Sequence, residues 1–430
     1  MTVETAGSSN IQVPKMGKGA WAVMIAVWIV GIVLAIAQYK AMATTTMIAA
    51  DWSLLASEAG WISGVFTFTG IILAFPAAVI VRKFGVKVGC AASAAFAVVG
   101  GLCGFFAGEF IAMIVSRIIE GVGLGLIGVI GPSAIAMWFP IEKRGLPMGI
   151  WSNWQMVGIS ICFYSTAPLT GGVDWKVMWI LGVICCAVGL VLAILLIKAP
   201  PKEFNHADVQ DEGAKLTSVF GMRDVWLVGL AGLAFGLSNS VVIQWVAPYW
   251  IFNCAMDPGM AGNLTGLLFT IECFFTVIFG FVYNKMKKRK VAIVADSALY
   301  TVTFLVIFTM TTVPLAIFSL WFYAIVEAFF CTAMWTLVGQ TVTDPRVAPG
   351  AIAVYTIFID IGMWLGPIFS GMILDNAAIA AGVDPTGGAG AGVPGAFFGV
   401  TIFVIAAQLV ATLAWALLKL YNEKGERVKM

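Results

Sequence analysis

Seven charged side chains lie inside long apolar segments, and they are the residues of this sequence most suited to chemistry. They are Lys40, Arg117, Glu120, Glu272, Asp296, Glu327 and Asp360. A carboxyl group can bind and release a proton, whereas an ammonium or guanidinium group can bind an organic anion. Because an ionisable group in an apolar environment is costly, such residues by default indicate an ion or substrate pathway.

The segment SRIIEGVGLGLIGVIG, residues 116–131, holds two of these charges among closely spaced glycines. Arg117 and Glu120 are three residues apart, so on a helix they share a face and can form an ion pair. The glycines leave the backbone bare, which favours close helix packing inside a bilayer. Two interpretations of Arg117 follow from this pattern: a structural ion pair with Glu120, or a contact with a substrate.

The composition is that of a membrane protein. Of the 430 residues, 61% are apolar and 11% charged, and the mean hydropathy is +0.98. In a typical soluble domain, about a quarter of the residues are charged. One helical crossing needs about 20 apolar residues, and the sequence contains twelve such runs. They are Trp21 to Met47, Gly60 to Val81, Val88 to Ala107, Phe110 to Phe139, Gly145 to Leu169, Met178 to Ile197, Val225 to Ile251, Gly262 to Tyr283, Val291 to Val313, Leu315 to Val342, Gly350 to Leu374 and Ala396 to Leu420. We therefore predict an all-α membrane protein with twelve transmembrane helices.

The basic residues predict the orientation in the membrane. With a cytoplasmic N-terminus, all of the 24 Lys and Arg residues except Lys40, Arg117 and Lys176 fall on the cytoplasmic side. Short cytoplasmic loops of membrane proteins carry this excess of positive charge. We expect both termini in the cytoplasm and the chain in the cytoplasmic membrane.

Two features recur about 200 residues apart and predict an internal duplication. Short basic turns follow Ala78 and Gly280, and Pro-Gly elements surround Pro168 and Pro367. An even number of helices in each half makes the repeat parallel, with two pseudo-symmetric six-helix bundles. The predicted divisions are an N-terminal bundle, a cytoplasmic linker, a C-terminal bundle and a cytoplasmic tail, at residues 1–197, 198–224, 225–421 and 422–430.

The sequence indicates no enzyme, cofactor or metal site. The eight cysteines form no CxxC pattern, and the only histidine, His206, lies in the hydrophilic linker. No nucleophile with a positioned base and no phosphate-binding glycine loop is present. The basic clusters are short turns that membrane topology explains, so we expect no nucleic acid partner.

The turns and helix ends resemble those of the major facilitator superfamily of secondary transporters. The turn that contains Arg82, Lys83, Gly85 and Lys87 is similar to the turn signature of that family. A second copy of this turn, in the second half of the chain, contains Asn284, Lys285 and Arg289. In this sequence Arg82 replaces the usual acidic residue. The segment RIIEGVG fits the family's R-x-x-x-G-x-G pattern, and APLTGG is similar to its G-P-x-x-G-G element.

The string WFPIEKRG, residues 138–145, resembles the corresponding turn of organic-anion branches such as anion:cation symporters and oxalate/formate exchangers. The resemblance implies alternating access of two bundles around a central site, in a protein that we expect to be a monomer. It also implies that Lys40 lies near the substrate position. Oxalate-type exchangers carry basic residues in helices where this chain has Glu272 and Asp360. This difference weakens a dicarboxylate assignment and favours a substrate with one carboxylate, a zwitterion or an amine.

Depth in the membrane distinguishes the buried charges, at about 1.5 Å per helical residue. Glu272, Glu327 and Asp360 lie near the middle of their apolar runs, where a side chain cannot reach water. Asp296 lies near a basic turn, where it can pair with Lys287 or Arg289. Lys40 lies outward of the middle of its run, so it can either extend to the outer interface or line a cavity.

Two mechanisms follow from these charges. In the first, Lys40 and Arg117 hold an organic anion while Glu272, Glu327 or Asp360 takes up a proton, with Glu120 as a further proton-coupling candidate. In the second, the acids hold a cationic or zwitterionic amine against the aromatic rings of Trp245, Trp250, Trp335, Tyr355 and Trp364. The candidate substrate ligands are therefore Lys40, Arg117, Trp245, Tyr355 and Trp364. Candidate residues of the cytoplasmic gate are Arg82, Lys83, Gly85, Lys87, Asn284, Lys285, Arg289 and Asp296. A non-transporting sensor built on a transporter fold is a third possibility.

Overall fold

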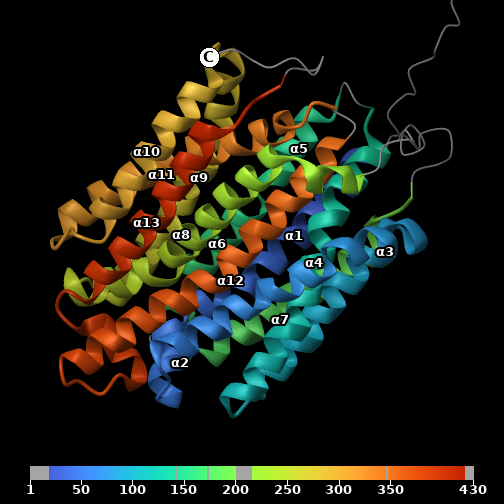
Figure 1. The fold of residues 1–430 in the computed structure, drawn as a ribbon. Helices are drawn as coiled ribbons and strands as arrows, with labels where there is room; N and C mark the ends of the chain where they lie inside the picture. Colours follow the sequence, from blue (N-terminus) through green and yellow to red (C-terminus); the bar gives the residue numbers. More distant parts are fainter. Residues whose placement is uncertain (1–18, 141–142, 172–173, 200–215, 345–346, 422–430) are drawn as a thin grey trace, which may run out of the picture.

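The computed structural model describes residues 19–140, 143–171, 174–199, 216–344 and 347–421, and these residues form helices joined by turns (Figure 1). The α-helices are α1 Ala20–Ala43, α2 Thr45–Trp52, α3 Ala56–Phe105, α4 Phe110–Trp138, α5 Gly145–Ser152, α6 Trp154–Thr170, α7 Lys176–Leu196, α8 Arg223–Asn253, α9 Pro258–Lys285, α10 Arg289–Ile307, α11 Val313–Val338, α12 Ala348–Ala380 and α13 Ala396–Leu417. Short 3-10 helices are η4 Leu216–Gly221, η5 Gly339–Thr341 and η7 Thr386–Gly392. The all-helical prediction is confirmed; the tail 422–430 and linker residues 200–215 lie outside the described ranges.

Within the described residues, eleven helical segments are long and apolar enough to cross a membrane. Two of them, Ala56–Leu73 and Lys83–Phe105, belong to α3, which turns at Gly85. Gly85 has a φ of 82°, a left-handed conformation that a residue without a Cβ adopts readily. The predicted run from Gly145 to Leu169 is not among the eleven segments, because it is divided into α5 and α6, which meet at Asn153.

The first predicted run also contains a break. The sequence predicts one helix from Trp21 to Met47, whereas α1 ends at Ala43 and α2 begins at Thr45. Thr44 Oγ1 donates to the Lys40 carbonyl at 2.7 Å, and Thr45 Oγ1 donates to the Ala41 carbonyl at 2.9 Å. Such side-chain bonds to the backbone compete with the helical pattern and allow a bend.

The N-terminal helices pack through bare backbone. Helices α1, α3, α4, α6 and α7 contact one another, and α8 to α13 form the second group (Figure 1). A Cβ added at Gly121 would lie 2.3 Å from the Phe66 carbonyl oxygen, and one at Gly123 would lie 2.5 Å from that of Ser93. The glycines of 116–131 therefore let α4 lie directly against both halves of α3.

The two bundles meet along two lines, α3 with α12 and α6 with α9. On the first line, a Cβ at Gly60 would lie 2.4 Å from the Pro367 carbonyl oxygen. On the second line, Tyr164 and Thr270 join their hydroxyls at 3.1 Å. Both lines continue to one end of the molecule, where α3 and α9 begin. There, a Cβ at Gly371 on α12 would lie 2.5 Å from the Ala56 carbonyl oxygen at the start of α3, and one at Gly259 at the start of α9 would lie 3.5 Å from Ala167 Cβ near the end of α6. We call this end of the molecule the sealed end.

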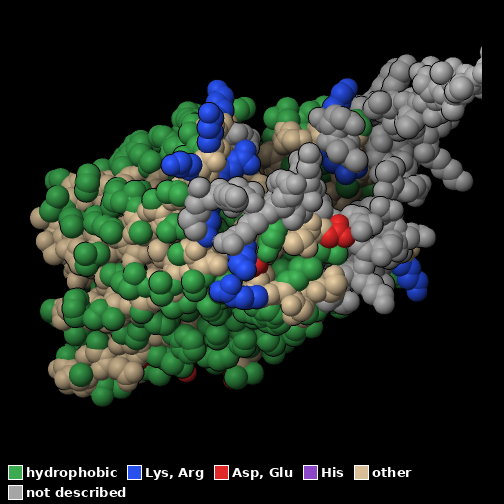
Figure 2. Space-filling model, turned by 45° about the horizontal axis from the view of Figure 1, so that its top comes forward, with side chains coloured by type: hydrophobic (Ala, Val, Ile, Leu, Met, Phe, Trp, Pro, Cys, Tyr) green, Lys and Arg blue, Asp and Glu red, His purple; other side chains and the backbone are tan. Residues whose placement is uncertain are grey.

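The opposite end carries several exposed basic side chains. Lys83, Lys87 and Lys285 are exposed there, and Figure 2 shows Lys and Arg side chains gathered at this end above a surface that is largely hydrophobic. We call it the basic end. The apolar flank between the two ends is the surface expected of a protein surrounded by lipid.

Candidate functional site

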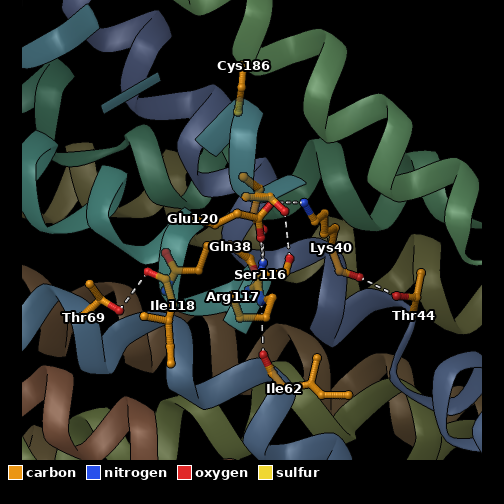
Figure 3. A network of polar contacts seen from close by, with 12 residues as sticks. Gln38, Lys40, Thr44, Ile62, Thr69, Ser116, Arg117, Ile118, Glu120 and Cys186 are labelled. Carbon is orange, nitrogen blue, oxygen red and sulfur yellow. Dashed lines mark hydrogen bonds and ion pairs between the residues drawn. The ribbon is translucent and has the colours of Figure 1, made fainter. Parts of the chain in front are cut away.

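Three charged side chains form one buried network inside the N-terminal bundle (Figure 3). Glu120 on α4 accepts from Lys40 Nζ on α1 through one carboxylate oxygen and from Arg117 Nη1 through the other. The three side chains are fully buried. Gly100 and Gly101 on α3 make room for the Glu120 carboxylate, since a Cβ at Gly101 would lie 3.0 Å from Glu120 Oε1.

Arg117 connects three helices through its guanidinium group. Its Nη1 donates to the Ala37 carbonyl at 2.7 Å, and its Nη2 donates to the Gln38 carbonyl at 2.7 Å, both on α1. Its Nε donates to the Ile62 carbonyl on α3 at 3.1 Å. The guanidinium is thus held by the protein itself on several sides, and it stacks over the Phe66 ring at 4.4 Å.

Lys40 lies in the interior of this bundle and does not extend to a membrane interface. Its ammonium is 4.8 Å from the centre of the Trp179 ring on α7. A Cβ at Gly182, also on α7, would lie 3.3 Å from Lys40 Nζ. The network therefore joins α1, α3, α4 and α7, and it contains two positive charges for one negative charge.

Glu272 on α9 and Glu327 on α11 are the most deeply buried acids described in the C-terminal bundle, at 2% and 0% exposure. Glu327 Oε1 accepts from Asn239 Nδ2 and, at 3.1 Å, from the Tyr300 hydroxyl. Glu272 Oε1 accepts from the Cys331 thiol at 3.5 Å. The partners that these bonds identify are neutral groups, in contrast to the ion-paired carboxylate of the N-terminal bundle.

The two acids lie close to each other. One carboxylate oxygen of each and the Cys331 sulfur are within 4.8 Å of one another. This is close enough for one cation to contact both carboxylates. Glu327 Oε2 has no hydrogen-bond partner among the described residues. Because Asn239 and Tyr300 already donate to Oε1, this second oxygen is the one that can bind a proton.

Asp360 and Tyr39 connect these acids with the other bundle. Asp360 is half-buried on α12, and a Cβ at Gly70 on α3 would lie 3.8 Å from its Oδ2. Tyr39 on α1 is buried. We call the part of the molecule that holds Tyr39, Asp360, Glu272 and Glu327 the central region.

The candidate aromatic ligands divide into two groups. Trp245 and Tyr355 are buried in the C-terminal bundle, where Trp245 Nε1 donates to Ser370 at 2.8 Å and the Tyr355 hydroxyl donates to Met334 Sδ. Trp364 lies between the bundles, with its ring 4.6 Å from that of Phe68. Its Nε1 has no hydrogen-bond partner in the described part of the chain.

The residues of the predicted cytoplasmic motifs lie at the basic end. Lys83 lies over the Phe84 ring, and Arg289 lies over the Tyr283 ring at 5.7 Å. Asp296 is half-buried on α10, where its Oδ2 has no hydrogen-bond partner among the described residues. The side chains of Arg82 and Asn284 lie outside the described part of the structure.

Several polar residues of the central region are ones that the sequence analysis did not identify. They are Gln38, Tyr39, Asn239, Gln244 and Tyr300. Gln38 is fully buried with neither amide atom hydrogen-bonded within the described residues, and Gln244 Nε2 donates to Thr45 at 2.7 Å across the bundles. A search for uncharged amides inside apolar runs could have found both glutamines.

Comparison with known proteins identifies the family. Residues 23–367 match the family model described as Major Facilitator Superfamily. The chain belongs to this superfamily. Members of this superfamily are multi-pass membrane transporters that carry small molecules across membranes, and they are not enzymes.

Curated relatives share modest identity with this member of the superfamily. An uncharacterized MFS-type transporter, YcnB, from Bacillus subtilis is 27% identical over 50% of the chain and 45% of the relative. The probable sulfoacetate transporter SauU from Cupriavidus necator is 24% identical over 47% of the chain and 50% of the relative. The match thus spans half or less of these two proteins. The hexuronate transporter of Bacillus subtilis is 21% identical over 77% of the chain and 82% of the relative.

Solved structures share the fold. A bacterial homologue of the human lysosomal transporter Spinster, in an inward-facing and occupied conformation, has a TM-score of 0.74 at 17% identity, covering 94% of this chain and 97% of that chain. A D-xylose-proton symporter has a TM-score of 0.70 at 17% identity, covering 95% and 99%. At these identities the likeness concerns the fold alone.

Proposed function

We propose that this transporter is a proton-coupled symporter of the cytoplasmic membrane that moves a small monocarboxylate or zwitterion by alternating access. The observation that carries the proposal is the pair of buried acids, Glu272 and Glu327, whose identified partners are neutral. A carboxylate buried without a cation is strongly disfavoured, so a proton or another cation must compensate it. A carboxyl group that is protonated on one side of the membrane and deprotonated on the other gives the transporter a means to carry a proton.

The charge of the N-terminal network supports an anionic substrate group. Lys40 and Arg117 together carry one more charge than Glu120 neutralises. A substrate carboxylate near α1 would balance that charge through the low-dielectric interior, even though the two side chains are bonded to the protein. The relatives whose printed names specify sulfoacetate and hexuronate as substrates carry anions, which agrees with this substrate class.

Uncharged groups would then recognise the remainder of the substrate. The Gln38 amide and the Trp364 indole N–H are unpaired within the described residues. An unpaired buried polar group costs about 1–3 kcal/mol, and a hydrogen bond to a substrate would remove that cost. We propose both as substrate ligands, with Asn239 positioning Glu327.

The test uses purified protein in liposomes with radiolabelled glucuronate and sulfoacetate, and with choline as the amine probe. The wild type is expected to accumulate an anionic probe when the outside is acidic. Glu327→Gln, which mimics the protonated state, should lose this accumulation and retain counterflow exchange without a pH gradient. The exposed Glu109→Gln is the matched control and should behave as the wild type.

Three outcomes would contradict the proposal. If Glu327→Gln and Glu272→Gln both accumulate the probe as the wild type does, these acids are not proton carriers. Uptake of choline in preference to both anions would favour the amine mechanism. Absence of transport of every probe by folded protein would favour a sensor.

A further inference from the structure

Asp375, near the end of α12, contacts the other bundle at the sealed end. Its Oδ1 accepts from the backbone N–H of Ala56 at 2.8 Å, and its Oδ2 accepts from that of Ser57 at 3.0 Å. These are the first two residues of α3, whose N–H groups have no partner within the helix. A carboxylate at this position also complements the positive end of the helix dipole. We call this pair of bonds the Asp375 cap.

The Asp375 cap is enclosed by close contacts between the same segments. Asp375 is only 6% exposed. A Cβ added at Gly371 would lie 2.5 Å from the Ala56 carbonyl oxygen, and the Gly388 N–H of η7 donates to the Leu54 carbonyl at 3.1 Å. The cap therefore forms only when α12 lies directly against the start of α3.

We propose that Asp375 is a gating residue of the transport cycle, whose carboxylate holds the sealed end shut by capping α3 from the opposite bundle. The inference rests on the proposed alternating access, in which α12 and the start of α3 must separate on one side of the membrane. Separation would expose the carboxylate and both N–H groups to water, which hydrates them. The bonds can therefore break and form again in each cycle.

Glu58 provides a matched control at the same helix end. Its Oε2 accepts from the Leu55 N–H at 2.8 Å, so it also places a carboxylate on the start of α3. Glu58 and Leu55 both belong to the N-terminal bundle, so they move together when the bundles separate. Removing this carboxylate should weaken the helix end without changing the balance between the two conformations.

The experiment measures hydrogen–deuterium exchange by mass spectrometry on the full chain in lipid nanodiscs. In Asp375→Asn, peptides covering residues 54–64 and 386–392 should exchange about tenfold faster than in the wild type, while peptides near Lys83 and Lys285 exchange more slowly. Glu58→Gln should change exchange only within residues 54–60. The opposite changes at the two ends distinguish gating from a general loss of stability, which would speed exchange everywhere.

The proposal is overturned if Asp375→Asn exchanges as the wild type does, if both ends exchange faster, or if Glu58→Gln reproduces the whole pattern. Asp375→Glu keeps the charge but displaces the carboxylate, so it should give the same pattern more weakly. This variant replaces Asp375→Asn in the experiment if Asp375→Asn does not fold. Because exchange needs no substrate, its result stands whether or not glucuronate and sulfoacetate are transported. A failure of uptake alone therefore concerns the proposed function and not the cap.

Discussion

Glu120 determines the charge balance of the N-terminal bundle. It is the carboxylate that both Lys40 and Arg117 contact, and all three side chains are fully buried. A buried ion pair adds little net stability because desolvation offsets the attraction between the charges. Removing one partner is different, since it leaves a charge that neither water nor protein neutralises.

We expect Glu120→Gln to destabilise the protein by about 3–5 kcal/mol, because it leaves two buried cations with a neutral neighbour. Unfolding in detergent, followed by intrinsic tryptophan fluorescence, measures the loss. Lys40→Met combined with Glu120→Gln removes one of the two cations and should recover more than half of it. Equal stabilities of the single and double variants would show that Lys40 and Glu120 are not energetically coupled.

The sequence could predict only the local half of this network. Arg117 and Glu120 are one helical turn apart, so their spacing alone indicates a pair. Lys40 is 80 residues from Glu120 along the chain, and no local pattern connects α1 with α4. The same holds for Glu327, whose partners Asn239 and Tyr300 lie on two other helices.

At the scale of helices, bare backbone controls how closely the bundles approach. A Cβ added at Gly64 on α3 would lie 2.3 Å from the Trp364 carbonyl oxygen on α12. Because this oxygen belongs to the backbone, it cannot move away by a side-chain rotation. At Gly128 on α4, no atom of the described residues lies within 4 Å of an added Cβ, apart from the backbone of the same helix turn. The two positions form a matched pair in helices of the same protein.

We expect Gly64→Ala to hold α3 and α12 apart and to reduce the uptake rate in liposomes at least about tenfold. Gly128→Ala should leave the rate within about twofold of the wild type, since it meets open space and alanine favours helix by up to about 1 kcal/mol. Equal rates for Gly64→Ala and the wild type would show that this contact does not need to form during transport.

Hydropathy predicts the order of the membrane helices but not their interruptions. The predicted runs correspond in order to the observed helices because a bilayer requires a long apolar segment for each crossing. The breaks at Thr44 and Asn153 occur inside apolar runs without proline or glycine at the break. They depend on side-chain bonds such as that from Thr44 to the Lys40 carbonyl and on packing, to which average hydropathy is insensitive.

At the scale of the molecule, the two bundles carry different kinds of charge. The N-terminal bundle contains an ion-paired network with an excess positive charge, and the C-terminal bundle contains the close pair Glu272 and Glu327. Asp360 on α12 lies close to Gly70 on α3 of the N-terminal bundle. In the proposed cycle, the proton is carried by one bundle while the substrate anion is attracted by the other, so both ligands are released only when the bundles move.

The direction of that movement depends on which side of the membrane the basic end faces, and reporter fusions can determine it. The excess of Lys and Arg at this end predicts that it faces the cytoplasm. Green fluorescent protein fused after residue 430 should fluoresce, and alkaline phosphatase fused after Asp174 in the opposite loop should be active. Exchanging the two reporters should abolish both signals, which controls for expression. Phosphatase activity at residue 430 would show that the basic end faces outward. The sealed end would then close the cytoplasmic entrance instead of the outer one.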